Sequence, residues 1–215
     1  MENTRLARFE SAQASLPLVA ILRGVTPAEA EGVAKTLYDA GFRLIEVPLN
    51  SPEPFESIVR MRACLPDDAL VGAGTVLRMA DVERLAAIGA DLVVMPHADV
   101  VVIAAAKALG LICLPGVVTP TEAFAALRAG ADALNLFPAE LVSPLVIKAM
   151  RAVLPKETRL FPVGGITPDN QSPFLAAGAN GFGLGSALYS PGITLEQLAE
   201  RAECFVAAWE SQCVA

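Results

Sequence analysis

The sequence predicts an α/β fold of the (β/α)8 type, a parallel eight-stranded TIM barrel with an extra N-terminal helix. Short apolar segments rich in Val, Ile and Leu alternate with amphipathic segments along the chain. Such apolar segments are typical of strands buried on both faces of a parallel sheet. The expected strands are residues 18–22, 44–49, 70–73, 92–95, 111–114, 133–137, 159–163 and 181–184. Eight repeats of a strand and a helix favour the barrel over a doubly wound open sheet, which would need fewer strands.

Helix boundaries are marked between these strands. Thr26-Pro27 and Thr119-Pro120 each place a hydroxyl at a helix cap and a proline in the first turn. Glycines such as Gly41 can end a helix in the left-handed conformation. The expected helices include residues 28–40, 81–88, 100–109, 121–129 and 144–153. We also expect residues 5–14 to cap the bottom of the barrel and residues 195–212 to close its ring of helices.

The composition indicates one globular domain over residues 1–215. The chain is 54% hydrophobic and 18% charged, which excludes disorder, and its net charge of −7 argues against a nucleic-acid partner.

The apolar stretch 16–22 is too short to span a bilayer and no signal peptide precedes it, so we expect a cytoplasmic protein with no membrane partner. The cysteines form no CxxC pair, which is typical of reduced thiols; they are Cys64, Cys113, Cys204 and Cys213.

Two glycine-rich loops follow the last two expected strands. Residues 163–168 read VGGITP and residues 181–186 read GFGLGS. Glycines let backbone N–H groups approach an anion closely, and Ser186 could start a helix whose N-terminus faces the anion. The pair of loops matches the common phosphate site of a TIM barrel, although glycines also serve simple tight turns.

Polar residues at the ends of the early strands are the candidates for chemistry. Glu46 interrupts an apolar strand, where an unpaired carboxylate is expensive to bury. It is either a general acid/base in a polar pocket or the partner of a cation such as Arg23. Arg23, at the end of the first strand, could hold a substrate carboxylate with two hydrogen bonds. Thr75 offers a hydroxyl after the third strand or serves only the turn.

His97 is the only histidine in the chain. No cluster of His and Cys surrounds it in sequence, so we expect no metal site. Nothing around it resembles a nucleophile elbow, which argues against a Ser-His-Asp triad.

Six segments match the motifs of one enzyme family. They are ILRG at 21–24, EVPLNSP at 46–52, GAGTVL at 72–77, LFPA at 136–139, VGGITP at 163–168 and LGS at 184–186. From about residue 16 to the C-terminal helix, the chain resembles the class I aldolases that cleave 2-keto-3-deoxy-6-phosphogluconate (KDPG) or 2-keto-3-deoxy-6-phosphogalactonate (KDPGal). Asn50, where the KDPG aldolases usually carry arginine, and the ILRG segment favour the KDPGal branch; KDPG aldolase is the alternative.

The resemblance implies a lyase of carbohydrate metabolism. In that family a lysine forms a Schiff base with the C2 ketone, and the C3–C4 bond breaks to give pyruvate and D-glyceraldehyde 3-phosphate. By position, Glu46 would move protons, and Arg23 and Thr75 would hold the pyruvyl end. The phosphate would lie on Gly164, Gly165, Gly185 and Ser186. The family implies a homotrimer that needs no metal or other cofactor.

One residue departs from the family pattern. Asn135 stands where the family has its Schiff-base lysine. An amide cannot condense with a ketone, because its lone pair is delocalised into its own carbonyl. The four lysines are Lys35, Lys107, Lys148 and Lys156; all are predicted in outer helices or in a loop at the barrel bottom, too far to replace it. We therefore predict no catalytic Schiff base and little or no turnover.

Several interpretations of Asn135 remain open. The substitution could be engineered to silence the enzyme, or natural in a non-catalytic protein that binds sugar-acid phosphates. It could also support a non-covalent reaction in which Glu46 removes a proton next to a carbonyl. Other small phosphate-binding barrels, such as those that make thiamine phosphate or tryptophan precursors, share the glycine loops but place their charged residues on different strands.

Overall fold

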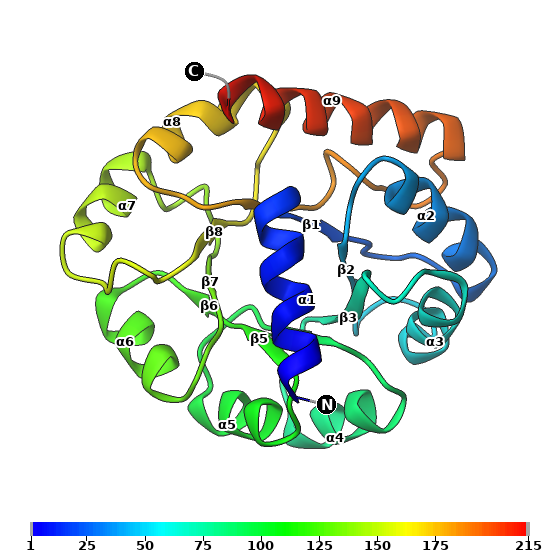
Figure 1. Cartoon of the computed structure of the whole chain (residues 1–215), viewed down its shortest axis with the longest axis horizontal. Coiled ribbons are helices and arrows are strands. Elements are labelled where there is room, and N and C mark those ends of the chain that lie inside the picture. Colours follow the sequence, from blue (N-terminus) through cyan, green and yellow to red (C-terminus); the bar gives the residue numbers. More distant parts are fainter. Residues whose placement is uncertain (1, 214–215) are drawn as a thin grey trace.

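The computed structural model describes residues 2–213, in which parallel strands alternate with helices (Figure 1). The strands are β1 Leu18–Ile21, β2 Leu44–Pro48, β3 Leu70–Gly74, β4 Leu92–Val94, β5 Ile112–Leu114, β6 Gly116–Val117, β7 Leu134–Leu136, β8 Leu160–Pro162 and β9 Phe182–Leu184. The helices are α1 Glu2–Ser15, α2 Pro27–Asp39, α3 Pro54–Cys64, α4 Met79–Ala87, α5 Val100–Ala108, α6 Pro120–Arg128, α7 Pro144–Arg151, α8 Gln171–Ala176 and α9 Leu195–Cys213, with a 3-10 turn η1 at Pro168–Asn170. Helices α2 to α9 surround the strands as a ring.

The prediction of a closed eight-stranded barrel is wrong. The strands form two parallel sheets, one of six strands in the order β5-β4-β3-β2-β1-β9 and one of three strands in the order β6-β7-β8. Each of the eight predicted strands has a counterpart, but β6 is an additional short strand. The fold is therefore a curled α/β arrangement of two sheets.

Prolines and glycines lie where the two sheets part. Pro115 separates β5, which pairs with β4, from β6, which pairs with β7. Pro162 ends β8, and beyond it, within residues 2–213, the three-stranded sheet is joined to β9 by one isolated bridge, Val163 to Gly183. Proline has no N–H to donate to a strand ladder, so each site interrupts continuous pairing.

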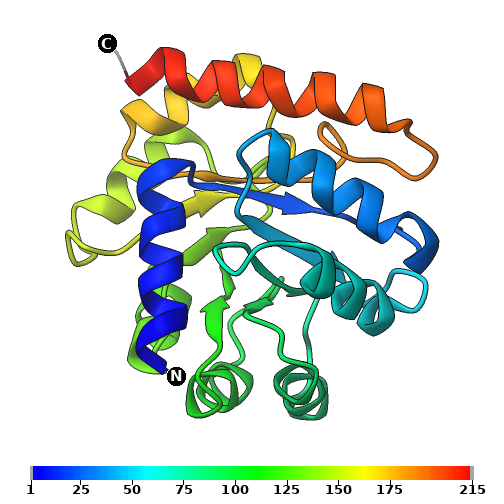
Figure 2. The same cartoon turned by 45° about the vertical axis from the view of Figure 1, so that its right-hand side comes forward.

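Helix α1 closes one end of the space between the sheets. Phe9 and Ala12 of α1 pack with apolar side chains from both sheets, among them Leu44, Ile112 and Phe161. Phe9 is fully buried in this inner cluster. Figure 2 shows α1 lying against one end of the strands. The predicted helical cap at residues 5–14 is confirmed, and ligands must enter from the other end.

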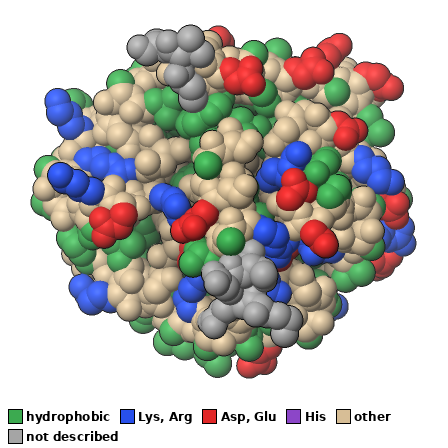
Figure 3. Space-filling model, in the orientation of Figure 1, with side chains coloured by type: hydrophobic (Ala, Val, Ile, Leu, Met, Phe, Trp, Pro, Cys, Tyr) green, Lys and Arg blue, Asp and Glu red, His purple; other side chains and the backbone are tan. Residues whose placement is uncertain are grey.

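A buried carboxylate fastens α1 to the strands. Asp91, directly before β4, is 1% exposed and accepts hydrogen bonds from Arg8 Nη2 at 2.5 Å and Arg5 Nε at 3.3 Å. Arg62 of α3 completes the cluster, with its Nη1 3.4 Å from Asp91 Oδ2. Figure 3, which has the orientation of Figure 1 with α1 in front, shows acidic and basic side chains close together on this face of the molecule. Several hydrogen bonds to one carboxylate offset the cost of burying its charge.

A larger apolar cluster lies between the strands and the ring of helices. Its members include Leu18, Ile45 and Val71 from the strands and Leu37 and Ile58 from the helices. Thr26 and Thr119 are the N-caps of α2 and α6, as the sequence predicts, and Ser143 is the N-cap of α7; a proline follows each of them. Within residues 2–213, no helix is both long and apolar enough to cross a membrane.

Candidate functional site

The predicted site residues gather at the carboxyl ends of the strands, away from α1. Arg23 follows β1, Glu46 lies in β2, Thr75 follows β3 and Asn135 lies in β7. The glycine loops follow β8 and β9. In parallel α/β sheets this edge is where ligands bind.

An inner pocket brings four of these residues together. Arg23, Glu46, Thr75 and Asn135 all line it, together with apolar side chains that include Phe137. Since β2 belongs to the six-stranded sheet and β7 to the three-stranded sheet, Glu46 and Asn135 enter the pocket from different sheets.

Glu46 is a buried and incompletely paired carboxyl group. It is 3% exposed, and its Oε2 has no hydrogen-bond partner among the described residues. Burial raises its pKa to about 8, and the Arg23 charge and a backbone hydrogen bond from Gly74 lower it only in part. The carboxyl group lies against Gly74, where an added Cβ would come within 2.1 Å of Oε2. A carboxyl group with a pKa near neutrality suits proton transfer.

Arg23 does not neutralise Glu46 directly. No salt bridge within 4.0 Å joins them in the described part of the chain, so the alternative interpretation of Glu46 as the ion-pair partner of Arg23 is not supported. Arg23 Nη1 instead donates to Oδ1 of Asn50 at 2.6 Å. This bond holds an exposed guanidinium at the mouth of the pocket, where its remaining donors can meet a carboxylate.

Thr75 has a strained backbone. Its φ of 56° is in the left-handed region, which β-branched residues rarely adopt. Such a conformation costs on the order of 1–3 kcal/mol and persists only where the surroundings impose it. Thr75 lines the inner pocket beside Glu46, so this strain lies at the site.

Asn135 is held within the wall of the pocket. It is 4% exposed, and its Nδ2 donates to the backbone carbonyl of Leu114 at 3.3 Å. The Nδ2 group carries two hydrogens, so one N–H remains for a ligand.

None of the four lysines lines the inner pocket. Lys107 Nζ binds Asp132 Oδ2 at 2.6 Å and the Leu111 carbonyl at 3.0 Å, both at the amino ends of strands. Lys35 and Lys148 are exposed on α2 and α7, and Lys156 is exposed before β8. Among the described residues, no lysine amine lies in the pocket of Glu46.

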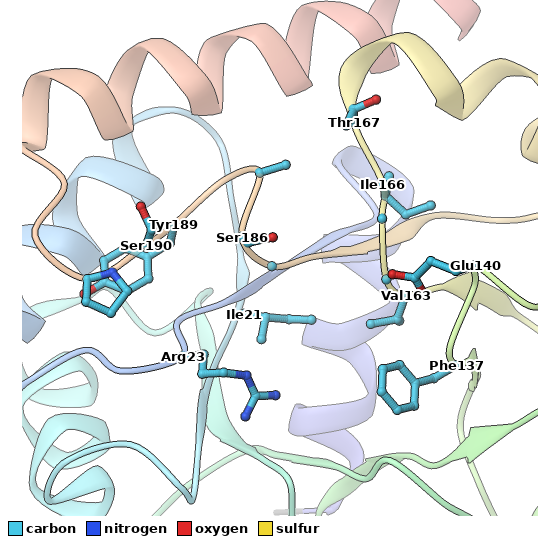
Figure 4. A pocket seen from close by; sticks show the side chains of 15 residues that line it. Ile21, Arg23, Phe137, Glu140, Val163, Ile166, Thr167, Ser186, Tyr189 and Ser190 are labelled. Carbon is cyan, nitrogen blue, oxygen red and sulfur yellow. The ribbon is translucent and has the colours of Figure 1, made fainter.

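An outer cavity of about 500 Å³ adjoins the inner pocket. Both are lined by Ile21, Arg23, Phe137 and Val163, so they form one continuous cleft. The outer cavity is also lined by the four predicted anion-binding residues Gly164, Gly165, Gly185 and Ser186 (Figure 4). This volume is in the usual range for small-molecule sites.

The glycine loop after β8 needs its glycines. Gly164 and Gly165 have φ values of 112° and 62°, which disfavour other residues. The backbone N–H groups of Gly165 and Ser186 have no protein acceptor in the described chain. Free N–H groups around a cavity can bind an anion.

The loop after β9 differs from the prediction. Residues 186–188 form a turn, and the next helix, α9, starts only at Leu195. No helix N-terminus therefore starts at Ser186. A Cβ at Gly185 would meet no atom within 4 Å, so the backbone there is open to the cavity.

Two residues of the outer cavity, Glu140 and Tyr189, were not predicted from the sequence. Both line this cavity, where Arg23 and Glu140 are the only charged side chains among the described residues. A Cβ at Gly164 would come within 2.4 Å of Glu140 Oε2, so this carboxylate lies on the glycine loop. Figure 4 shows Arg23 and Glu140 on different sides of the cavity. Glu140 follows the end of β7 by a few residues. This position near a strand end was the feature of the sequence that could have identified it as a site residue.

His97 lies outside this cleft and is exposed. Within residues 2–213, no three or more His, Cys, Asp and Glu side chains gather closely enough to hold a metal ion.

Comparison with known proteins shows the family of this chain. Residues 9–203 match the family model for KDPG and KHG aldolase. The chain is 48% identical to the "Probable 2-dehydro-3-deoxy-6-phosphogalactonate aldolase" of Rhizobium meliloti (91% of this chain, 92% of the relative) and 47% identical to the 2-dehydro-3-deoxy-6-phosphogalactonate aldolase of Escherichia coli K12 (92% and 96%). A solved structure described as native KDPGal superposes with a TM-score of 0.91 at 46% identity, over 93% of this chain and 97% of that one.

Proposed function

Because the chain belongs to the KDPG and KHG aldolase family of class I aldolases, we propose that its cleft binds the substrate of the KDPGal branch, 2-dehydro-3-deoxy-6-phosphogalactonate. The chain nevertheless lacks the amine that cleaves this substrate. The observation that carries the proposal is Asn135, which is buried in the same pocket as Glu46 while the other predicted site residues are present.

The keto-acid end of the substrate enters the inner pocket. Arg23 at the mouth offers guanidinium donors to the C1 carboxylate, and Thr75 offers a hydroxyl. Glu46 lies beside the C2 and C3 atoms and is the group that moves protons. With a lysine at position 135, an iminium at C2 would accept the electron pair of the breaking C3–C4 bond.

The phosphate end occupies the outer cavity. The N–H groups of Gly165 and Ser186 are free to donate, and Gly164 and Gly185 leave the backbone accessible. Glu140 lies against Gly164, close to the proposed phosphate position, and its carboxylate repels the negatively charged phosphate. Arg23 is the one cation that lines the described cavity, so backbone donors supply most of the attraction.

The assembly is expected to be a homotrimer, as the family resemblance implies. Leu141, which directly follows Glu140, and Leu145 of α7 are 74% and 78% exposed. Burial against a second copy of the chain would remove this apolar area from water. Sedimentation velocity at several concentrations would measure the molar mass; a monomer at every concentration would contradict the trimer.

Pyruvate release tests the proposed function. We expect no release from 2-dehydro-3-deoxy-6-phosphogalactonate by the present chain and clear release by the Asn135→Lys variant, followed with a coupled pyruvate assay. Release from the KDPG epimer at an equal or higher rate would assign the scaffold to the gluconate branch. If a folded Asn135→Lys variant cleaves neither epimer, the proposed function fails.

A further inference from the structure

The inner pocket retains both groups that are needed to form an enolate without a covalent intermediate. Glu46 presents a buried Oε2 that has no partner, and Asn135 presents a side-chain amide from the neighbouring sheet. We infer that this pair exchanges the C3 hydrogens of bound 2-keto acids such as pyruvate, without a Schiff base. The inference rests on the proposed function only in placing the keto-acid end in the inner pocket.

The reaction balances with these two residues alone. The Glu46 carboxylate takes a proton from C3, and the electron pair of that C–H bond forms the C2–C3 double bond. The C2 carbonyl oxygen becomes an enolate oxygen, which accepts a hydrogen bond from the Asn135 amide. Return of a proton from Glu46 to C3 restores the keto acid, and solvent exchange at Glu46 introduces deuterium when the reaction runs in D2O.

The surroundings of Asn135 suit this role. One of its Nδ2 hydrogens is donated to the Leu114 carbonyl, which fixes the direction of the other. The residue is 4% exposed, so a hydrogen bond from this amide to an enolate is not weakened by solvent. A fixed donor aimed at a developing oxyanion typically contributes about 10²–10³-fold in rate.

The surroundings of Glu46 suit the role of base. Thr75 and Asn135 line the pocket with Glu46, and Gly74 lies against its carboxyl group. Arg23 is the only other charged or titratable group among the described residues that line this pocket. The pKa of Glu46, raised to about 8 by burial, makes its carboxylate a stronger base than an exposed one. The exchange rate should therefore rise with pH up to about 8 and then level off.

Loss of the pyruvate methyl signal in deuterated buffer, followed by proton NMR, tests this inference. We expect exchange by the present chain above the buffer rate, at least a tenfold loss in Asn135→Leu, and a return to the buffer rate in Glu46→Gln. Glu31→Gln, which makes the same change at an exposed position on α2, is the matched control and should leave the rate unchanged. Thermal unfolding of each variant establishes that it is folded.

Three outcomes would overturn the inference. Exchange no faster than buffer, exchange that survives in folded Asn135→Leu, or a borohydride-trapped pyruvate adduct on any native lysine would each do so. If Asn135→Lys cleaves the sugar acid while the present chain shows no exchange, the proposed function stands and this inference alone fails.

Discussion

Among single residues, Asn135 is the one from which we predict the loss of covalent aldolase chemistry. We propose that Asn135 stands at the Schiff-base lysine position of the family, in a pocket where Glu46 is buried and Thr75 has a strained backbone. Residue type alone decides this point, because an amide has no free lone pair to attack a ketone. This prediction comes from the sequence alone, because a family motif assigns a role to a position through residue type and spacing.

Burial of Glu46 has a consequence for stability. Its pKa is about 8 in the folded state and near 4.5 when unfolded, so the folded state binds the proton more tightly. Its contribution to stability is therefore complete below about pH 4.5 and is lost as the pH rises to about 8. We expect Glu46→Gln, which keeps the shape without the charge, to gain stability relative to the present chain over this range, by on the order of 1 kcal/mol per pH unit.

Urea unfolding at a series of pH values measures this difference. Glu31→Gln, the same substitution at an exposed position, is the control, and we expect it to change the free energy of unfolding by less than about 0.5 kcal/mol. A Glu46→Gln difference that stays constant from about pH 5 to 8 would contradict the burial of an uncompensated carboxyl group.

Glu140 should weaken anion binding at the glycine loop. Its carboxylate lies against Gly164, where it repels a phosphate. We expect Glu140→Gln to bind inorganic phosphate roughly fivefold more tightly at low salt, or about 1 kcal/mol, because the interaction is largely exposed to solvent. The gain should shrink as ionic strength rises.

Isothermal titration calorimetry with inorganic phosphate measures this gain. Glu83→Gln, an exposed glutamate on α4 outside the cleft, controls for net charge. Equal affinities for Glu140→Gln and Glu83→Gln would show that Glu140 does not act at the phosphate position.

Among the helices and strands, α1 packs at the amino ends of the strands and contributes to stability. The candidate site lies at the opposite, carboxyl ends. Helix α1 fills the space between the amino ends of the strands with Phe9 and Ala12, and the cleft opens at the carboxyl ends. Capping and glycine signals predicted most helices, because these signals act within a few residues. They could not predict that residues 186–188 form a turn rather than the start of a helix. Whether a helix starts there is not decided by the neighbouring glycines alone.

Substitution of Phe9 tests whether α1 seals the inner apolar cluster. Its side chain is fully buried, so Phe9→Ala should lower the free energy of unfolding by about 3–5 kcal/mol. Leu6→Ala is the matched control on the same helix; Leu6 is 40% exposed, and we expect a change within about 0.5 kcal/mol. Urea unfolding compares the two. Equal effects would mean that α1 does not seal the inner cluster.

At the scale of the whole molecule, the strands were predictable but their closure was not. Apolar periodicity predicted eight segments that all appear as strands. The break at Pro115 and the single bridge between Val163 and Gly183 depend on how strands from distant parts of the chain pair. The same limit applies to Glu140, whose contact with Gly164 joins two loops that the sequence does not bring together.

We propose that this cleft is an aldolase site that lacks only the reactive amine. Borohydride reduction in the presence of pyruvate, followed by peptide mass spectrometry, tests it most directly. We expect no stable adduct on the present chain and one adduct at position 135 of the Asn135→Lys variant. A reduced pyruvate adduct on Lys35, Lys107, Lys148 or Lys156 of the present chain would contradict it.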